Sequence, residues 1–251
     1  MSSADLRLTP GYREWPPSAA LRGWLACLWA AVLPDQPSVA DVTPDGCTDL
    51  IWQSGHGAYI AGPDTGPAPA PLPPGTIVIG ARFRPGAGGA AFGIPLMALR
   101  DQRVDLADCL PALARVLPGD LPAETALERV TRVSAQLASA GPPDHAVLHG
   151  ARLLARRGTV AALSAELGMS ERQLLRRFDA AVGYGPKTLH RVLRFQRVLG
   201  HLTATGPGTD LADLAVRSGY ADQAHMTREI TRLAGRPPGA LIRQLTSAGT
   251  P

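Results

Sequence analysis

Apolar residues follow different patterns in the two halves of the chain. In the first ~110 residues they form short runs between turns, and the runs at 50–52 and 76–79 indicate buried strands. The stretch 62–75 contains six prolines and no helical period, which predicts an exposed loop. Residues 21–29 match a helix and a strand almost equally, because an apolar run with two tryptophans fits either period. We therefore expect a small β-rich sandwich or barrel with one or two helices.

The second half has the spacing of helices. Apolar residues predict a helix over residues 123–140, and Gly141-Pro142-Pro143 ends it. Every later apolar pattern is helical. The predicted fold class is α+β, with a β-rich regulatory domain over residues 1–140 and an all-α domain over residues 144–247.

The all-α half contains two copies of one unit. Residues 163–168 match residues 214–219 at an offset of 51, and after the following turn the offset becomes 52. The pairs at the second offset are Leu174/Met226, Arg176/Arg228, Phe178/Ile230, Gly183/Gly235 and Pro186/Pro238. Each copy is therefore a helix, a glycine-containing turn, a second helix and then Gly-x-x-Pro.

The local chemistry of each unit is that of a helix-turn-helix. In the first copy Gly168 ends a helix, where a left-handed backbone costs glycine little. Ser170 then caps the second helix, and Gln173 completes a capping box. In the second copy Gly219 ends a helix and Asp222 caps the next.

Each second helix has an inward and an outward face. Leu174 and Phe178 face inward in the first copy, and Met226 and Ile230 do so in the second. An outward face with Arg and Gln suits the major groove, because Arg can bind guanine and Gln can bind adenine through paired hydrogen bonds. The predicted DNA-binding residues are Glu171, Arg172, Leu175, Arg176, Gln223, Ala224, Thr227 and Arg228.

The segment 186–202 joins the two units and has apolar faces of helical spacing. As a helix it would run roughly 26 Å and could hold two recognition helices about 34 Å apart, one turn of B-DNA. The charge distribution agrees with DNA binding by the second half, because the formal net charge is −4 over residues 1–149 and +8 over residues 150–251. The second half is thus expected to meet a polyanion.

With these residues, the stretch from about 144 to 245 resembles the AraC/XylS-type DNA-binding domain, in which two helix-turn-helix units flank a long connecting helix. The matching landmarks are Leu163, Gly168-Met169-Ser170, Leu174, Arg176, Phe178, Gly183, Pro186, Arg194, Leu214-Ala215, Gly219-Tyr220, Gly235 and Pro238. Two positions depart from the pattern, since Ile230 replaces the usual aromatic residue and Pro237 the usual Ser or Thr. The resemblance implies a sequence-specific transcription regulator.

The first half resembles a poorly characterised N-terminal domain of some members of this family, through segments 44–51 and 80–86. The resemblance implies that this domain binds an effector or dimerises. The expected partners are double-stranded DNA, a small-molecule effector, RNA polymerase and a second copy of the chain. No apolar run reaches the ~18 residues that span a bilayer, so we expect no membrane partner. Three cysteines without CxxC spacing fit a reducing cytosol, and the expected location is cytoplasmic and nucleoid-associated.

Three residues of the first half are candidate effector contacts. Arg82 and Arg84 would share one face of a strand and could meet an anionic effector. The favoured alternative is a solvated pair or ion pairs within the domain. Trp52, like the other three tryptophans, either lines an effector pocket or belongs to the core, and the core is the favoured reading.

Cys47, Asp49 and His56 lie close in sequence and raise the alternatives of a thiol nucleophile and a metal site. The favoured reading is a small buried Cys with Asp and His in turns. Three dispersed cysteines without CxxC spacing argue against a zinc cluster and a disulfide scaffold. No catalytic residue, metal or cofactor is predicted, and the alternative function is a DNA-tethered thiol-dependent enzyme that uses Cys47. The glycine-rich stretch 86–89 lacks the Lys-Ser/Thr of a phosphate loop and a following helix signal, which predicts a turn.

Overall fold

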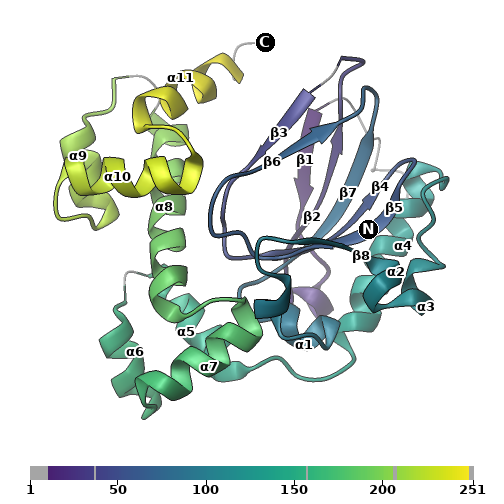
Figure 1. Ribbon diagram of the computed structural model, residues 1–251, viewed down its shortest axis with the longest axis horizontal. Helices are drawn as coiled ribbons and strands as arrows, with labels where there is room; N and C mark the ends of the chain where they lie inside the picture. Colours follow the sequence, from purple (N-terminus) through teal and green to yellow (C-terminus); the bar gives the residue numbers. More distant parts are fainter. Residues whose placement is uncertain (1–10, 37, 157, 206–207, 249–251) are drawn as a thin grey trace.

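The computed structural model describes residues 11–36, 38–156, 158–205 and 208–248. Its N-terminal region is rich in strands and its C-terminal region is helical, which confirms the expected fold class (Figure 1). The strands are β1 (Gly11–Trp15), β2 (Leu25–Val32), β3 (Ser38–Val42), β4 (Thr48–Gln53), β5 (Gly57–Ala61), β6 (Ala68–Leu72), β7 (Ile77–Phe83) and β8 (Arg103–Asp105).

Six strands form one antiparallel sheet in the order β1-β2-β7-β4-β5-β8, and β3 pairs with β6 in a separate two-stranded sheet. The ambiguous segment 21–29 is mostly strand, because β2 follows a short 3-10 helix, η2 (Ala19–Leu21). Leu28 packs into the core on one face of the sheet, whereas Cys27 and Trp29 pack on the other. A strand that is buried on both faces has an unbroken apolar run, and this explains why its period was ambiguous.

The prediction of a loop throughout residues 62–75 is wrong at β6. This strand pairs with β3, and Pro69 and Pro71 lie opposite residues 41 and 39. The two prolines are two residues apart, so both lie at the same one of the two alternating kinds of position in an antiparallel ladder. The other residues of the strand, Ala68, Ala70 and Leu72, keep their N–H groups. Proline is tolerated on an edge strand of this kind.

The N-terminal region contains more helices than expected. Besides η2 these are α1 (Gly88–Phe92), η3 (Leu96–Leu99), α2 (Leu106–Cys109), α3 (Pro111–Ala114) and α4 (Ala123–Ala138). The predicted turn at 86–89 is wrong at its end, because α1 begins at Gly88. Tertiary packing explains this helix, since a Cβ atom on Gly89 would lie only 2.7 Å from the Ala180 carbonyl oxygen. Helix α4 covers the sheet and buries Leu127 and Val130 in its core.

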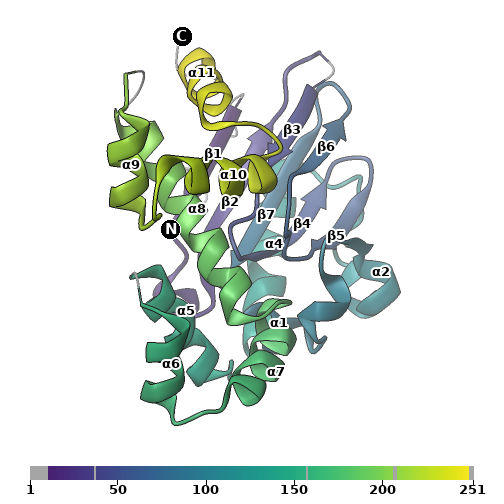
Figure 2. The same cartoon turned by 60° about the vertical axis from the view of Figure 1, so that its left-hand side comes forward.

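The C-terminal helices are α5 (His145–Ala155), α6 (Val160–Leu167), α7 (Glu171–Val182), α8 (Pro186–Thr205), α9 (Leu211–Ser218), α10 (Gln223–Ala234) and α11 (Pro238–Ala248). The connecting helix α8 has 20 residues, which corresponds to about 30 Å. Figures 1 and 2 show α7 and α10 against different parts of α8, with the sheet beside them. No helix in the described part of the chain is long and apolar enough to cross a membrane.

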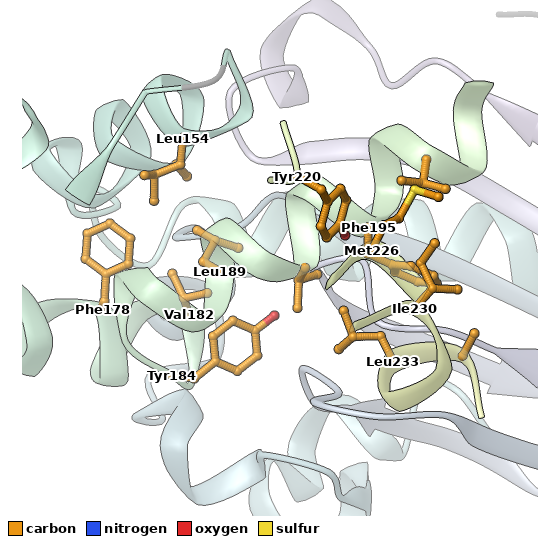
Figure 3. Close-up of a cluster of buried hydrophobic side chains, with 14 of the residues drawn as sticks. Leu154, Phe178, Val182, Tyr184, Leu189, Phe195, Tyr220, Met226, Ile230 and Leu233 are labelled. Carbon is orange, nitrogen blue, oxygen red and sulfur yellow. The ribbon is translucent and has the colours of Figure 1, made fainter. Parts of the chain in front are cut away.

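One hydrophobic core holds both helix-turn-helix units (Figure 3). Phe178 of α7, Phe195 of α8, and Met226 and Ile230 of α10 are all fully buried in it. Leu174 is buried beside them. The shared core fixes the two units relative to α8.

Candidate DNA-binding interface

The first helix-turn-helix is formed by α6 and α7. Gly168 ends α6 in the left-handed conformation, with φ of 59°. The hydroxyl of Ser170 accepts a hydrogen bond from the Gln173 backbone N–H at 3.3 Å, and the Gln173 side chain accepts one from the Ser170 N–H at 2.9 Å. This reciprocal capping box fixes where α7 begins and how its exposed residues are oriented.

The second helix-turn-helix is formed by α9 and α10. Gly219 ends α9 with φ of 82°, and the Asp222 carboxylate accepts a hydrogen bond from the His225 N–H at 2.6 Å. Ile230, at the position where the family has an aromatic residue, is fully buried. Pro237 precedes α11, and its carbonyl oxygen accepts hydrogen bonds from the N–H groups of residues 240 and 241.

Arg194 of α8 joins the second unit to the connecting helix. Its guanidinium donates to both oxygens of Glu229 on α10, at 2.7 and 2.6 Å, and lies 4.1 Å from the centre of the Tyr220 ring. Glu229 is buried and also accepts a hydrogen bond from Arg191 at 3.2 Å. Although burial acts to raise the pKa of Glu229, the bonds from Arg194 hold it below its ordinary value. Arg194 is thus a structural residue of this domain.

The eight predicted DNA-binding residues lie on the outer faces of α7 and α10. On α7, Glu171, Arg172, Leu175 and Arg176 are exposed, and on α10, Gln223, Ala224 and Arg228 are exposed while Thr227 is half-buried. Leu175 exposes 49% of its surface. Each unit therefore presents an arginine-bearing face to solvent.

A cationic hollow beside α10 was not predicted from the sequence. It holds about 410 Å³ and is lined by Arg191, Arg194, His225, Arg228, Glu229 and Arg232. Four arginines surround one carboxylate, so the hollow carries a net positive charge. The spacing of Arg228 and Arg232, four residues apart on one helix, is the sequence signal that could have indicated it.

A loop of the N-terminal region contacts the C-terminal ends of α7 and α10, the second helices of the two units. At the end of α7, a Cβ atom on Gly183 would lie 2.4 Å from Pro63 Cγ. At the end of α10, a Cβ atom on Gly235 would lie 3.2 Å from Pro67 Cγ. We refer to residues 62–67 as the bridging loop. It contacts one unit through Pro63 and the other through Pro67.

The bridging loop is held in place by polar contacts within the N-terminal region. The buried Asp64 carboxylate accepts two hydrogen bonds from Arg103, at 2.9 and 2.8 Å. The Thr65 backbone N–H donates to Asp101 at 2.6 Å, and the Thr65 hydroxyl donates to the same carboxylate. The loop is therefore anchored to the segment around β8.

Two further hydrogen bonds join the regions. The Arg100 guanidinium donates to the carbonyl oxygen at the end of α7 at 2.7 Å, and the Gln196 side chain of α8 donates to the Pro44 carbonyl oxygen at 2.6 Å. Beside Pro44, a Cβ atom on Gly46 would lie 2.8 Å from a leucine side chain of α8. The glycine at this position allows the turn to approach the connecting helix closely.

The three candidate effector contacts lie in different surroundings. The Arg82 Nε lies 3.3 Å from both Asp45 and Asp49, and its Nη1 lies 3.3 Å from Glu14. Burial raises the pKa of Asp49 to about 6, with Arg82 acting in the opposite direction. Arg82 is therefore engaged in ion pairs within the N-terminal region.

Arg84 and Trp52 each hold a neighbouring segment. The Arg84 side chain donates to the Arg22 carbonyl oxygen at 2.9 Å. Trp52 is fully buried in the sheet core, and its indole N–H donates to the Pro118 carbonyl oxygen at 2.7 Å. Arg82, Arg84 and Trp52 therefore have different partners within the N-terminal region.

The surroundings of Cys47 do not favour a thiolate. Burial, followed by the nearby carboxylates of Asp45 and Asp49, raises the pKa of the Cys47 thiol. His56 instead pairs with Asp105 at 3.0 Å. The histidine that could have activated the thiol is thus paired with another residue, and the described residues contain no group of three or more potential metal ligands.

Two family models match the chain. A domain of unknown function (DUF6597) matches residues 13–105, and a helix-turn-helix domain matches residues 163–244. The C-terminal part of the chain is an AraC-type helix-turn-helix domain. This confirms the resemblance found in the sequence, and it supports a role of the chain as a DNA-binding transcription regulator. The N-terminal half carries the DUF6597 domain. No curated protein matches the sequence significantly.

Among solved structures, the chain is similar to ToxT from Vibrio cholerae O395, with 10% identity and a TM-score of 0.44 over 89% of this chain and 97% of that one. It is also similar to wild-type ToxT from Vibrio cholerae strain SCE256 with an unsaturated fatty acid bound, with 12% identity and a TM-score of 0.43 over 89% of this chain and 96% of that one.

Proposed function

We propose that this regulator reads two adjacent major grooves with α7 and α10, and that residues 1–140 control the reading done by residues 144–247. The proposed base and backbone contacts are Glu171, Arg172, Leu175 and Arg176 from α7, with Gln223, Ala224, Thr227 and Arg228 from α10. Ser170 and Asp222 act as helix caps that set the orientation of these side chains.

The observation that carries the proposal is the pair of matched recognition helices. Each is capped at its N-terminus, buried on one face in the same core, and exposed on the face that carries Arg176 or Arg228. The bridging loop contacts α7 and α10 at their C-terminal ends. The N-terminal turns of both helices are exposed. Two such helices, joined by a helix of about 30 Å, match the separation of successive major grooves on one side of B-DNA.

Footprinting and binding-site selection with the full-length protein test this proposal. Arg176→Ala and Arg228→Ala should each relax base preference at a few base pairs, in two sets about one turn apart, at a cost of about 1–3 kcal/mol each. The control is Arg152→Ala, which removes an exposed charge from α5. If both substitutions weakened binding to all sequences equally, the two arginines would be phosphate contacts and the proposed base reading would be wrong.

Control by residues 1–140 is supported by their direct contact with both helix-turn-helix units. A small molecule or a second copy of the chain that shifts the bridging loop, Arg100 or the turn at Pro44 would act on α7, α8 and α10 together. We propose that a small-molecule effector exerts this control. We also propose that the protein forms a homodimer, contacts RNA polymerase and acts on the nucleoid. Operator affinity that never changes across an effector panel, in a protein that stays monomeric, would contradict this control.

A further inference from the structure

A groove runs between α4 and the segment of residues 15–24. It holds about 880 Å³, within the range of roughly 300–1,000 Å³ that small-molecule sites occupy. Buried Leu21, Leu28 and Leu127 belong to its lining and also to the main core of the N-terminal region. The groove is thus an extension of that core to the surface.

Two tryptophans give the groove its chemistry. Trp15 and Trp24 line it and are half-buried. Within the described residues neither indole N–H has a hydrogen-bond partner, whereas Trp29 donates to Asp49 and Trp52 to a carbonyl oxygen. Buried tryptophans usually find an acceptor for this N–H, and the N–H groups of these two stay available at the groove. The groove therefore offers flat aromatic faces and two donors to a molecule from outside.

The charged residues of the groove favour a neutral occupant. Arg22 and Arg132 contribute two positive charges, and Glu124 and Glu128 contribute two negative charges. In the described part of the chain none of the four forms an ion pair. The groove therefore presents two charges of each sign and no net charge. A ligand with a net charge would gain from one pair and be repelled by the other.

We infer that this groove binds a neutral, ring-bearing small molecule. The inference rests on the proposed control by residues 1–140 for its consequence. Ala138 and Ser139 line the groove at the end of α4, and Asp144, six residues after Ala138, caps α5 of the DNA-binding region. A ligand that moves the last turn of α4 therefore acts on the connection between the two regions.

A matched pair of fluorescent probes tests the site in the full-length protein. N-Phenyl-1-naphthylamine is neutral, and 8-anilinonaphthalene-1-sulfonate has the same rings with a negative charge. The neutral probe should bind one site saturably, quench tryptophan fluorescence, and bind at least about tenfold more tightly than the sulfonate, equal to about 1.4 kcal/mol. Both probes are titrated into the wild type and into four variants.

The variants fill the groove from opposite walls. Ala135→Phe on α4 and Ala20→Phe on η2 each place a ring in the groove, whereas Gln136→Phe and Ala19→Phe change neighbouring exposed positions outside it. We expect at least about tenfold weaker binding of the neutral probe in the first two variants and unchanged binding in the controls.

Three outcomes would overturn the inference. They are no saturable binding of the neutral probe, equal binding in all four variants, or loss of a dimer in place of loss of probe binding, as measured by light scattering. Failure of the proposed function is measured separately, by operator footprinting of the same variants without probe, so the two results are distinguishable.

Discussion

At the scale of single residues, arginines with similar sequence contexts have different roles. Arg176 and Arg228 are exposed on the recognition helices, whereas Arg194 exposes 12% of its side chain and is bound to buried Glu229. All three are landmarks or repeat partners in the sequence, and spacing alone does not separate an exposed arginine from one that supports the fold. The separation comes from the partner carboxylate, which lies 35 residues away from Arg194 along the chain.

We predict that Arg194→Ala destabilises the protein by about 2–4 kcal/mol, because it leaves the buried Glu229 carboxylate with only Arg191 to pair it. Urea unfolding monitored by circular dichroism measures this change. The control, Arg176→Ala, should shift the free energy of unfolding by less than about 0.5 kcal/mol, since exposed surface substitutions usually do. Equal effects of the two substitutions would contradict the structural role of Arg194.

Asp49 should make stability depend on pH. Its pKa in the folded protein is about 6, above the ordinary value of 3.8, so the folded state binds the proton more tightly than the unfolded state. Its contribution to stability is therefore complete below pH ~4 and is lost as the pH rises through about 6, by at most about 3 kcal/mol. Asp49→Asn should reduce this fall in urea unfolding measured from pH 4 to 7.

Asp108→Asn is the control for that measurement, because it removes a carboxylate that is exposed in the folded protein. Its unfolding free energy should follow the wild type across the same pH range. An Asp49→Asn protein that also followed the wild type would show that Asp49 titrates normally.

At the scale of elements, the sequence predicted the repeated units well, because their caps, turns and core positions are local. Ser170 with Gln173 and Asp222 with His225 interact over three residues, and such contacts are visible in a sequence. Strand β6 and helix α1 were missed because both depend on distant partners. β6 exists through its pairing with β3, and α1 through its contact with α7.

The candidate interface shows the same division. The outer faces of α7 and α10 follow from helical periodicity, whereas the hollow that includes Arg191 requires α8 to cross α10. The groove beside Trp15 and Trp24 could not be predicted either, because its other wall is α4, about a hundred residues later in the chain. Sites formed by contacts of this kind need the fold.

Asp144 illustrates a prediction at this scale. Its carboxylate caps α5 by accepting from the N–H groups of Ala146 and Val147, and it accepts two hydrogen bonds from Arg177 of α7 at 2.7 Å. Asp144→Ala removes both interactions and should cost about 1–3 kcal/mol in chemical denaturation. Asp144→Asn keeps a capping oxygen and should cost less. Equal losses in the two variants would show that the cap contributes nothing measurable.

At the scale of the whole molecule, the N-terminal region and the DNA-binding region are in contact along α1, η3 and the bridging loop. We predict that Gly89→Val separates α1 from α7, because its Cβ atom alone would lie 2.7 Å from a backbone oxygen. Hydrogen exchange should then increase at the end of α7, while the exposed N-terminal turn stays unchanged. Ala90→Val, one residue later, is the control, and an equal increase there would contradict the role of the close contact.

The bridging loop has a consequence for the DNA itself. Because Pro63 contacts the end of α7 and Pro67 contacts the end of α10, these two helices cannot rotate independently about α8. One base pair inserted between the two half-sites turns one of them by about 34° around the duplex axis. A protein whose two DNA-binding helices moved independently would tolerate that change. Under the proposed function, this protein should require its half-sites at a fixed angle around the duplex. Promoters under its control are therefore expected to vary in base sequence between the half-sites but not in the number of base pairs that separates them.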